Sequence, residues 1–124
     1  MEDADVVVLW GSNARETHPI FFHHVLRAVR AGARLIVVDP RHTQTAEFAD
    51  LWLPLDVGSD IALAHGMAHE IIAAGLVHEE FVRRATTGYD EFVAAVAEWT
   101  PERAEAITRV PAADIRAAAR AYAT

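Results

Sequence analysis

Apolar runs and segments of helical periodicity alternate along the first 75 residues. Residues 6–9 form a continuous apolar run, which predicts a parallel strand covered on both faces, and residues 34–38 are rich in β-branched side chains, which predicts a second buried strand. Between them, apolar residues recur at helical spacing from Pro19 to Gly32, with Thr17 or His18 at the cap position. The order predicted is therefore strand, glycine turn, helix, strand.

A third strand and a second long helix follow. Residues 45–49 predict a short helical turn, and residues 51–55 predict a strand that Pro54 confines to a sheet edge. A helix then begins at Gly58-Ser59-Asp60, with Ser59 as its cap, and ends at Gly75. Its predicted apolar stripe consists of Ile61, Ala64, Met67, Ala68, Ile71 and Ile72.

The pattern changes after Gly75, where only helical segments are expected, over residues 78–84, 89–99, 101–107 and 111–122. The predicted fold class is α/β, a Rossmann-like three-layer fragment with a short parallel sheet and a helical C-terminal part. About three strands are expected, in the order 3-2-1. Residues 1–75 are expected to form a βαββα half-domain, and residues 76–124 a helical extension packing on the same domain.

Composition narrows the possible functions. With 124 residues, of which 52% are hydrophobic, the chain can bury a core as one domain or part of one. A net charge of -7 argues against a nucleic-acid partner or an anionic membrane surface. The absence of cysteine excludes disulfides, thiolate nucleophiles and iron–sulfur ligation by this chain. No apolar run approaches the roughly 20 residues of a membrane span.

The turn after the first strand is the first candidate site. Gly11 permits close backbone approach, and Ser12 and Asn13 can donate hydrogen bonds to phosphate oxygens beside free backbone N–H groups. A plain strand-to-helix turn also uses Gly and Asn for its local conformation. The turn alone leaves both interpretations open.

Asp39 and Arg41, at the tip of the second strand, are stronger candidates. A carboxylate at this position accepts hydrogen bonds from ribose hydroxyls in dinucleotide folds, and an arginine can stack on a purine or bind phosphate. The alternative is a solvated Asp-Pro turn. Because the Gly11 turn and Asp39 are expected at the same edge of the sheet, ligand binding is the favoured interpretation. Asp60 can accept two N–H bonds from guanine, although it can also serve only as a helix cap.

The seven histidines raise the question of a metal site. His65 and His69 are four residues apart on one predicted helix, a spacing that metal ligands use. No cysteine supports them, and Gly66 stands after His65 where a zinc-binding His-Glu motif needs a glutamate, so no metal site and no catalytic residue are predicted in this chain.

Several segments in combination resemble one family. These are Leu9-Trp-Gly-Ser-Asn13, Glu16-Thr-His-Pro19, Leu35-Ile-Val-Val-Asp-Pro-Arg41, Thr43, Thr45-Ala46 and Gly58-Ser-Asp60, with Tyr89-Asp-Glu-Phe92, Trp99-Thr-Pro-Glu-Arg103 and Ile115-Arg-Ala-Ala-Ala-Arg120 further on. The combination resembles the molybdopterin oxidoreductases of the dimethyl sulfoxide reductase superfamily, nearest to the large subunit of formate dehydrogenases.

The resemblance implies a cofactor and a set of contacts. Such enzymes hold molybdenum or tungsten through two molybdopterin guanine dinucleotides, and residues 1–75 would be the cofactor-binding half-domain. By position, three groups of residues match cofactor contacts in the family: Asn13, Glu16 and Thr17 at phosphates and ribose, Val38, Asp39 and Arg41 around the guanosine, and Leu55, Gly58 and Asp60 at the guanine base.

The resemblance also implies that much of the enzyme lies outside this chain. The cysteines of the iron–sulfur cluster, the metal ligand and the catalytic histidine and arginine have no counterpart here. The chain is therefore expected to be a fragment of an oxidoreductase, inactive alone, with the remainder of the large subunit as its partner and the cytoplasm as its compartment.

The sequence leaves four alternative functions open, and it predicts that the chain self-associates. The parent enzyme is expected to oxidise formate, and a nitrate reductase of the same superfamily is the first alternative. A non-catalytic scaffold like the complex I large subunit, a free-standing nucleotide-binding module and a protein-interaction module are the others. Self-association is expected through the first strand, because in isolation it becomes an exposed sheet edge.

Overall fold

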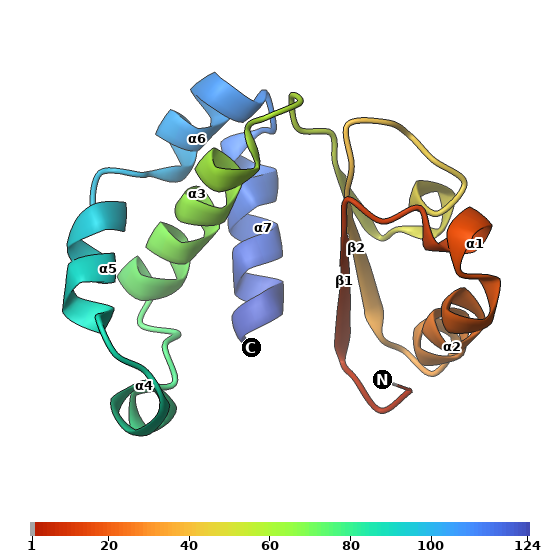
Figure 1. Ribbon diagram of the computed structural model, residues 1–124, viewed down its shortest axis with the longest axis horizontal. Helices are drawn as coiled ribbons and strands as arrows, with labels where there is room; N and C mark the ends of the chain where they lie inside the picture. The colour runs from red at the N-terminus through yellow and green to blue at the C-terminus, as the bar shows by residue number, and fades with distance from the viewer. Residues whose placement is uncertain (1) are drawn as a thin grey trace. The chain divides into compact units, whose positions relative to one another are not determined.

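The computed structural model describes residues 2–124, which fall into two compact units that divide between Leu55 and Asp56. The first unit carries the sheet and the second consists of helices and loops (Figure 1). The division into residues 1–75 and 76–124 stays a prediction, and the compact units divide after Leu55. Helix α3 (Asp60–Ala73) belongs to the second unit because it packs against the later helices of the chain.

Three parallel strands form the sheet of the first unit. They are β1 (Val6–Trp10), β2 (Arg34–Val38) and β3 (Leu51–Leu53), in the order β1-β2-β3. β1 pairs with β2 from Val6↔Arg34 to Trp10↔Val38, so both strands end at the same level. The third strand stops at Leu53, two residues before its predicted end, because Pro54 has no N–H to donate. The α/β class and the strand order are confirmed.

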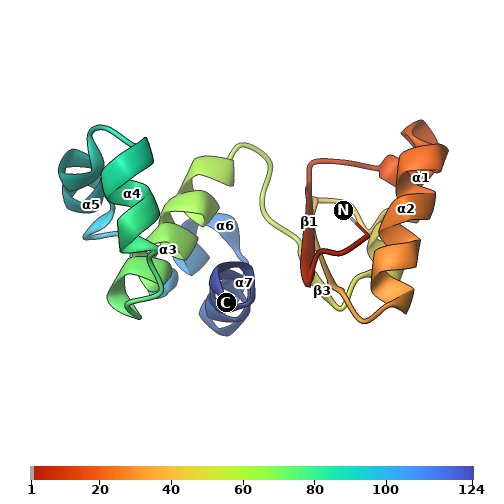
Figure 2. The ribbon, with the colours of Figure 1, turned by 90° about the horizontal axis from the view of Figure 1, so that it is seen from below.

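Helix α2 (Pro19–Arg30) covers one face of this sheet (Figure 2). Its buried residues Phe22, Val25 and Ala28 pack in one cluster with Val7, Leu9, Leu35 and Val37, which alternate along β1 and β2. That alternation is the two-residue period of a strand, and it places the four side chains on one face. Ile36 and Val38, on the opposite face, are also fully buried.

Two short elements flank this layer. The single turn α1 (Ala14–Thr17) precedes α2 and was not predicted, while the 3-10 turn η1 (Ala46–Phe48) was. Pro19 begins α2 after the cap residue His18, in agreement with the expected start. The Thr17 hydroxyl donates to the carbonyl of Asn13 instead of capping α2.

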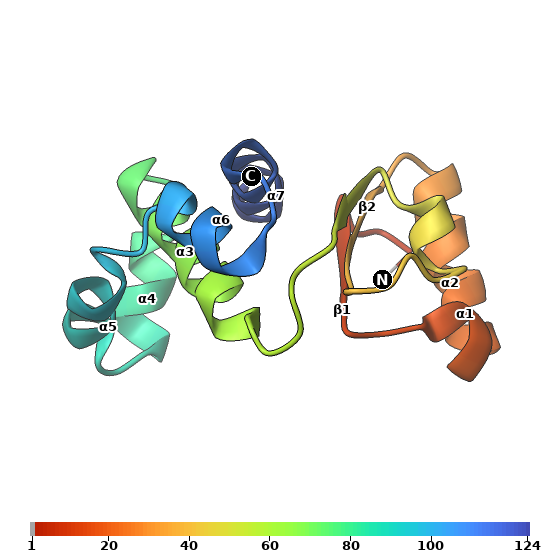
Figure 3. The same ribbon diagram turned by 90° about the horizontal axis from the view of Figure 1, so that it is seen from above.

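The second unit packs around α3. It continues with α4 (Glu79–Ala85), α5 (Tyr89–Val96), α6 (Pro101–Thr108) and α7 (Ala112–Ala123). Helices α5, α6 and α7 all contact α3, and α7 lies beside α3 and α6 (Figures 1 and 3). The helical C-terminal part is confirmed. No helix within residues 2–124 is long and apolar enough to cross a membrane.

The buried face of α3 differs from the predicted stripe. Its buried residues are Ala62, Leu63, Gly66, Met67 and Glu70, so Met67 alone is shared with the prediction. Ile61 is 70% exposed. Gly66 explains the choice of face, since an added Cβ would lie 2.6 Å from the Cβ of Ala104 on α6. The two helices approach closely where Gly66 carries no side chain.

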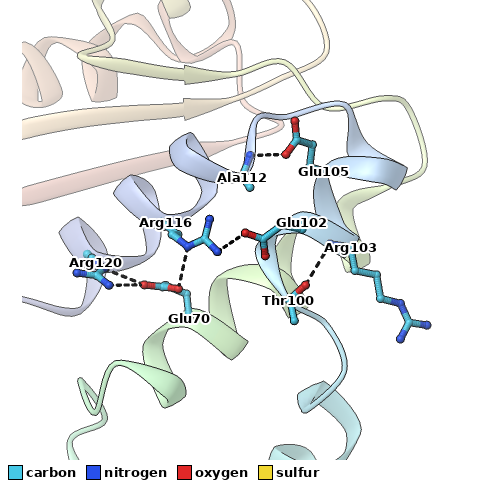
Figure 4. A network of polar contacts seen from close by, with 8 residues as sticks. All are labelled: Glu70, Thr100, Glu102, Arg103, Glu105, Ala112, Arg116 and Arg120. Carbon is cyan, nitrogen blue, oxygen red and sulfur yellow. Dashed lines mark hydrogen bonds and ion pairs between the residues drawn. The ribbon is translucent and has the colours of Figure 1, made fainter.

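A chain of charged contacts links α3, α6 and α7 (Figure 4). The buried carboxylate of Glu70 accepts hydrogen bonds from Arg120 at 2.8 Å and lies 3.5 Å from the Arg116 guanidinium. Arg116 also donates to Glu102 on α6. The single buried carboxylate of α3 thus faces two arginines of α7.

Candidate nucleotide-binding site

The first candidate loop begins where β1 ends. Gly11 adopts a left-handed φ of +60°, which favours glycine. Its N–H donates to the carbonyl of Val38 at 2.8 Å, so the loop is attached to the end of β2. Among residues 2–124, no atom other than those of adjoining residues lies within 4 Å of a Cβ built at Gly11. The turn therefore presents backbone to open space, which suits close approach by a ligand.

Both the main chain and the side chain of Asn13 accept hydrogen bonds. Its carbonyl accepts hydrogen bonds from the N–H groups of Glu16 and Thr17, both at 3.1 Å. Its side-chain Oδ1 accepts from the Thr45 hydroxyl at 2.9 Å, and that hydroxyl accepts from the Arg15 N–H at 3.0 Å. The amide of Asn13 is held in place before any ligand binds. Glu16 and Thr17, on α1, have exposed side chains.

Asp39 lies at the carboxyl end of β2 and is only 5% exposed. Its Oδ1 accepts from the Arg41 N–H at 2.9 Å, and its carbonyl accepts from Trp52 Nε1 at 2.9 Å. The first contact closes a local Asx turn, as an Asp-Pro turn can, but the side chain is buried and not solvated as the alternative interpretation had it. An ionised carboxylate has about four acceptor positions, so this single bond is compatible with further bonds from a ribose.

The segment after Asp39 is ordered by its own contacts. Arg41 is exposed, and its carbonyl accepts from the Thr43 N–H at 2.8 Å. The ring of His42 stands edge-on to Trp52, with 4.6 Å between centroids. The side chain of Val38 is fully buried, so any contact from Val38 to a ligand would come from its main chain.

The third candidate loop runs across the boundary of the two units. Leu55 closes the first unit and its side chain is buried, while Gly58 and Asp60 belong to the second. Gly58 has a φ of +86°, again with open space at its Cβ position within the described chain. Asp60 is exposed in the first turn of α3. The convergence of this loop with the other two stays a prediction.

Ser59 occupies the cap position of α3 as predicted, but its side chain has another role. The Ser59 hydroxyl donates to the carbonyl of Asp56 at 2.6 Å, and the Ser59 N–H donates to the same carbonyl at 3.1 Å. The expected capping bond from helix N–H to the hydroxyl is therefore replaced by a bond back into the loop. The loop before α3 is tightened by both groups of Ser59.

The two histidines of α3 have different surroundings. His65 lies beside the rings of Trp99 and Phe92, and within the described part of the chain its buried Nδ1 has no hydrogen-bond partner. His69 Nδ1 lies 3.0 Å from the carbonyl of Val96. No group of three or more acidic or histidine side chains in residues 2–124 is arranged to hold a metal ion.

Sequence reasoning missed two residues that order these loops. Thr45 was part of the quoted pattern without a role, yet it is fully buried and joins Asn13 to the segment after β2. Trp52 packs against the core, and its indole N–H also donates to the carbonyl of Asp39. The sequence held no signal for the role of Thr45, because its burial, which makes its hydroxyl require partners, is known only from the structure.

The donors of the first unit fit a nucleotide with phosphate groups. Backbone N–H groups near Gly11, the Ser12 hydroxyl, the Asn13 amide and the Arg41 guanidinium can donate to phosphate oxygens. The Asp39 carboxylate can accept from sugar hydroxyls. The register that ends β1 and β2 together, with the Gly11–Val38 hydrogen bond, brings the first two loops to one edge of the sheet.

Comparison with known proteins identifies the family. A family model described as molybdopterin oxidoreductase matches residues 1–118. Formate dehydrogenase H of Escherichia coli (strain K12) is 44% identical over 123 residues, 99% of this chain and 17% of that protein. Nitrate reductase of Symbiobacterium thermophilum is 36% identical, over 97% of this chain and 17% of that protein.

A solved structure agrees with these relatives. Acetylene hydratase from Pelobacter acetylenicus matches with a TM-score of 0.88 and 37% identity, over 94% of this chain and 16% of that chain. The chain therefore spans about one sixth of the length of the proteins it matches. The family model and the relatives agree with the fold, and the chain belongs to the molybdopterin oxidoreductase family.

Proposed function

We propose that this chain binds the guanosine diphosphate part of one molybdopterin guanine dinucleotide in a longer molybdenum or tungsten oxidoreductase. The observation that supports this most is the pair of loops at one sheet edge, where the open Gly11 turn is bonded to the end of β2 beside Asp39. Family membership supplies the kind of cofactor, and the donors and acceptors of these loops suit its nucleotide end.

The proposed contacts follow the order of the three loops. Gly11, Ser12 and Asn13 bind phosphate, with Glu16 and Thr17 beside the phosphates and ribose. The Asp39 carboxylate accepts from ribose hydroxyls, Arg41 lies against the guanosine, and Val38 contributes main-chain atoms. Leu55 and Gly58 contribute main-chain atoms beside the guanine, and Asp60 accepts two N–H bonds from its Watson–Crick edge.

For the whole enzyme we propose oxidation of formate to carbon dioxide with transfer of two electrons. When bound, the metal and its pterins supply the redox chemistry, and this chain binds and orients the nucleotide end of the cofactor. Formate dehydrogenases at 44% and 40% identity over nearly the whole chain support formate over the nitrate reductase at 36%. An iron–sulfur cluster belongs to the rest of the enzyme, since this chain has no cysteine.

A nitrate reductase is the second candidate, because a protein of that name is 36% identical over nearly the whole chain. The names of the relatives refer to three different compounds: formate, nitrate and acetylene. Similarity in this segment therefore reflects the fold that these proteins share and does not by itself distinguish their substrates. The partner proposed is the remainder of the large subunit, in the cytoplasm, and the isolated chain is proposed to be inactive. Turnover of formate by the isolated chain would contradict its proposed inactivity.

Titration calorimetry of the 124-residue chain with GDP and with ADP tests the proposal. GDP is expected to bind about tenfold more tightly, because the adenine edge cannot donate two N–H bonds to Asp60. Asp60→Asn should abolish this preference. Asp90→Asn is the matched control, since Asp90 also lies exposed in the first turn of a helix. Equal affinities for GDP and ADP would exclude guanine recognition by this chain.

A further inference from the structure

The Thr45 hydroxyl connects the two loops of the first unit. It donates to Oδ1 of Asn13 at 2.9 Å and accepts from the N–H of Arg15 at 3.0 Å. Thr45 is fully buried, so water has no access to replace either bond. Asn13 follows β1, whereas Thr45 follows β2, and 32 residues separate them in the chain.

The direction of these bonds determines how the Asn13 amide is turned. A backbone N–H can only donate, so Arg15 uses a lone pair of the hydroxyl and leaves the hydroxyl proton for Asn13. That proton needs an acceptor, and only the oxygen of an amide can accept it. The oxygen of the Asn13 amide therefore faces Thr45, and the NH₂ group is turned away from Thr45.

We propose that Thr45 is a positioning residue that holds the Asn13 NH₂ toward a phosphate oxygen of the bound nucleotide. The inference rests on the proposed function, in which Asn13 contacts the diphosphate. Without the Thr45 hydroxyl, the amide can rotate and present its oxygen, which repels phosphate. A preset donor avoids the entropy cost of ordering the side chain when the ligand binds.

The Thr45 hydroxyl also makes phosphate binding depend on the segment after β2. That segment carries Asp39 and Arg41 as well as Thr45, and the first loop carries Asn13. A hydrogen bond joins the two loops at Gly11 and Val38, and a second joins them at Asn13 and Thr45. The phosphate and ribose contacts are therefore held in one rigid arrangement.

The first test is Thr45→Val in the 124-residue chain, with binding of GDP and of guanosine measured by calorimetry. The variant keeps the shape of the side chain and removes the hydroxyl. Affinity for GDP should fall about tenfold, because the hydrogen bond from the Asn13 NH₂ to the charged phosphate is lost. Affinity for guanosine, which has no phosphate, should be unchanged. Thr45→Ser should restore GDP binding. A general structural defect would weaken both ligands, which would overturn the inference.

Two further variants serve as controls. Thr43→Val removes another buried hydroxyl of the same segment, which accepts from the Ala46 N–H and makes no bond to Asn13. It should leave GDP binding unchanged. Asn13→Asp keeps the acceptor for Thr45 but loses the NH₂ group, so it should lose GDP binding while its thermal unfolding midpoint stays above that of Thr45→Val.

A ligand-free measurement separates this inference from the proposed function. The side-chain NH₂ resonances of Asn13 in a ¹⁵N spectrum should move in Thr45→Val and stay unchanged in Thr43→Val. If the wild-type chain binds GDP no better than guanosine, the proposed function fails, and these resonances still report on Thr45. If they do not respond to Thr45→Val, or if that variant binds GDP like the wild type, Thr45 does not position Asn13.

Discussion

Arg120 on α7 donates from its guanidinium to the carboxylate of Glu70 on α3 at 2.8 Å, across 50 residues of sequence. The Glu70 side chain is only 9% exposed, and Arg116 contacts its other oxygen at 3.5 Å. A buried carboxylate requires such partners, so the contact adds a charged interaction to the apolar packing of α7, whose Ile115, Ala118 and Ala119 are fully buried. Glu70 is therefore expected to contribute to the stability of the helical unit.

Glu70→Ala should lower the free energy of unfolding by about 1–3 kcal/mol, since the variant leaves Arg120 without its acceptor, leaves Arg116 with Glu102 alone and opens a gap between helices. Urea unfolding followed by circular dichroism measures the loss. Glu80→Ala is the matched control, because Glu80 forms an exposed pair with Arg84 and should change stability by less than about 0.5 kcal/mol. Equal effects of the two variants would show that Glu70 is not required.

Gly66→Ala is expected to destabilise the same unit although alanine is the better helix former. Helix propensity favours alanine by about 1 kcal/mol. The added Cβ would lie 2.6 Å from the Cβ of Ala104, and such overpacking costs about 1–3 kcal/mol. Thermal unfolding should show a lower midpoint for Gly66→Ala, with partial recovery in Gly66→Ala combined with Ala104→Gly. A stabilised single variant would mean that α6 moves away freely.

The contact between Glu102 and Arg116 predicts a dependence of stability on pH. The hydrogen bond from Arg116 lowers the pKa of Glu102 from its ordinary 4.5. A carboxyl with a lowered folded-state pKa stabilises the fold above that ordinary value, and the contribution is lost as the pH falls through the folded pKa. The thermal midpoint of the wild type should therefore exceed that of Glu102→Gln near neutral pH, and the two should converge in acid.

Nuclear magnetic resonance titration gives the control for this dependence. The carboxyl of Glu102 should titrate below its ordinary pKa in the wild type and return toward that value in Arg116→Gln, since the guanidinium is the main cause of the shift. A titration of Glu102 that is the same in both proteins would contradict the contact.

The strands and most helices could be predicted because their signals are local. The β-branched run of β2 and the proline that begins α2 act within a few neighbouring residues. The buried face of α3 could not, because alanines lie on several sides of this helix. Gly66 selects the face through a contact with Ala104, and no local pattern contains that information.

Part of the candidate site could also be predicted from the sequence, and part could not. The Gly11 turn and the tip of β2 were predictable, since parallel strands paired in register end at one edge of the sheet. The bond between Thr45 and Asn13 was not, because it joins loops that are distant in sequence. The alternative for Asp39 was a solvated Asp-Pro turn; the structure has a local turn at this residue, but its side chain is buried.

Gly11→Ala and Gly11→Asn separate backbone strain from ligand approach. Alanine at the left-handed φ of +60° costs about 1–2 kcal/mol, partly offset by a less flexible unfolded chain. Asparagine tolerates this conformation better, so its unfolding free energy should lie closer to that of the wild type. Both side chains occupy the open space at the turn, and both should weaken GDP binding about tenfold.

Gly75→Ala is the control for Gly11, since Gly75 ends α3 with a similar φ of +66° and an open Cβ position in the described chain. It should show the same loss of stability as Gly11→Ala without any change in GDP affinity. If Gly11→Asn binds GDP like the wild type, the Gly11 turn is not a phosphate-binding loop.

Strand β1 should mediate self-association of the isolated chain. It lies at one edge of the sheet that the described residues form, and its sequence Val-Val-Val-Leu-Trp carries no charge or proline. Such an edge can pair with another chain, and a lysine on an edge strand opposes this pairing. Val8→Lys should therefore shift the chain from dimers or larger assemblies toward the monomer in sedimentation velocity. Val57→Lys is the control, because Val57 is an exposed loop residue and adds the same charge away from the strand. A wild-type chain that stays monomeric at high concentration, or equal responses to the two lysines, would contradict a role for this edge.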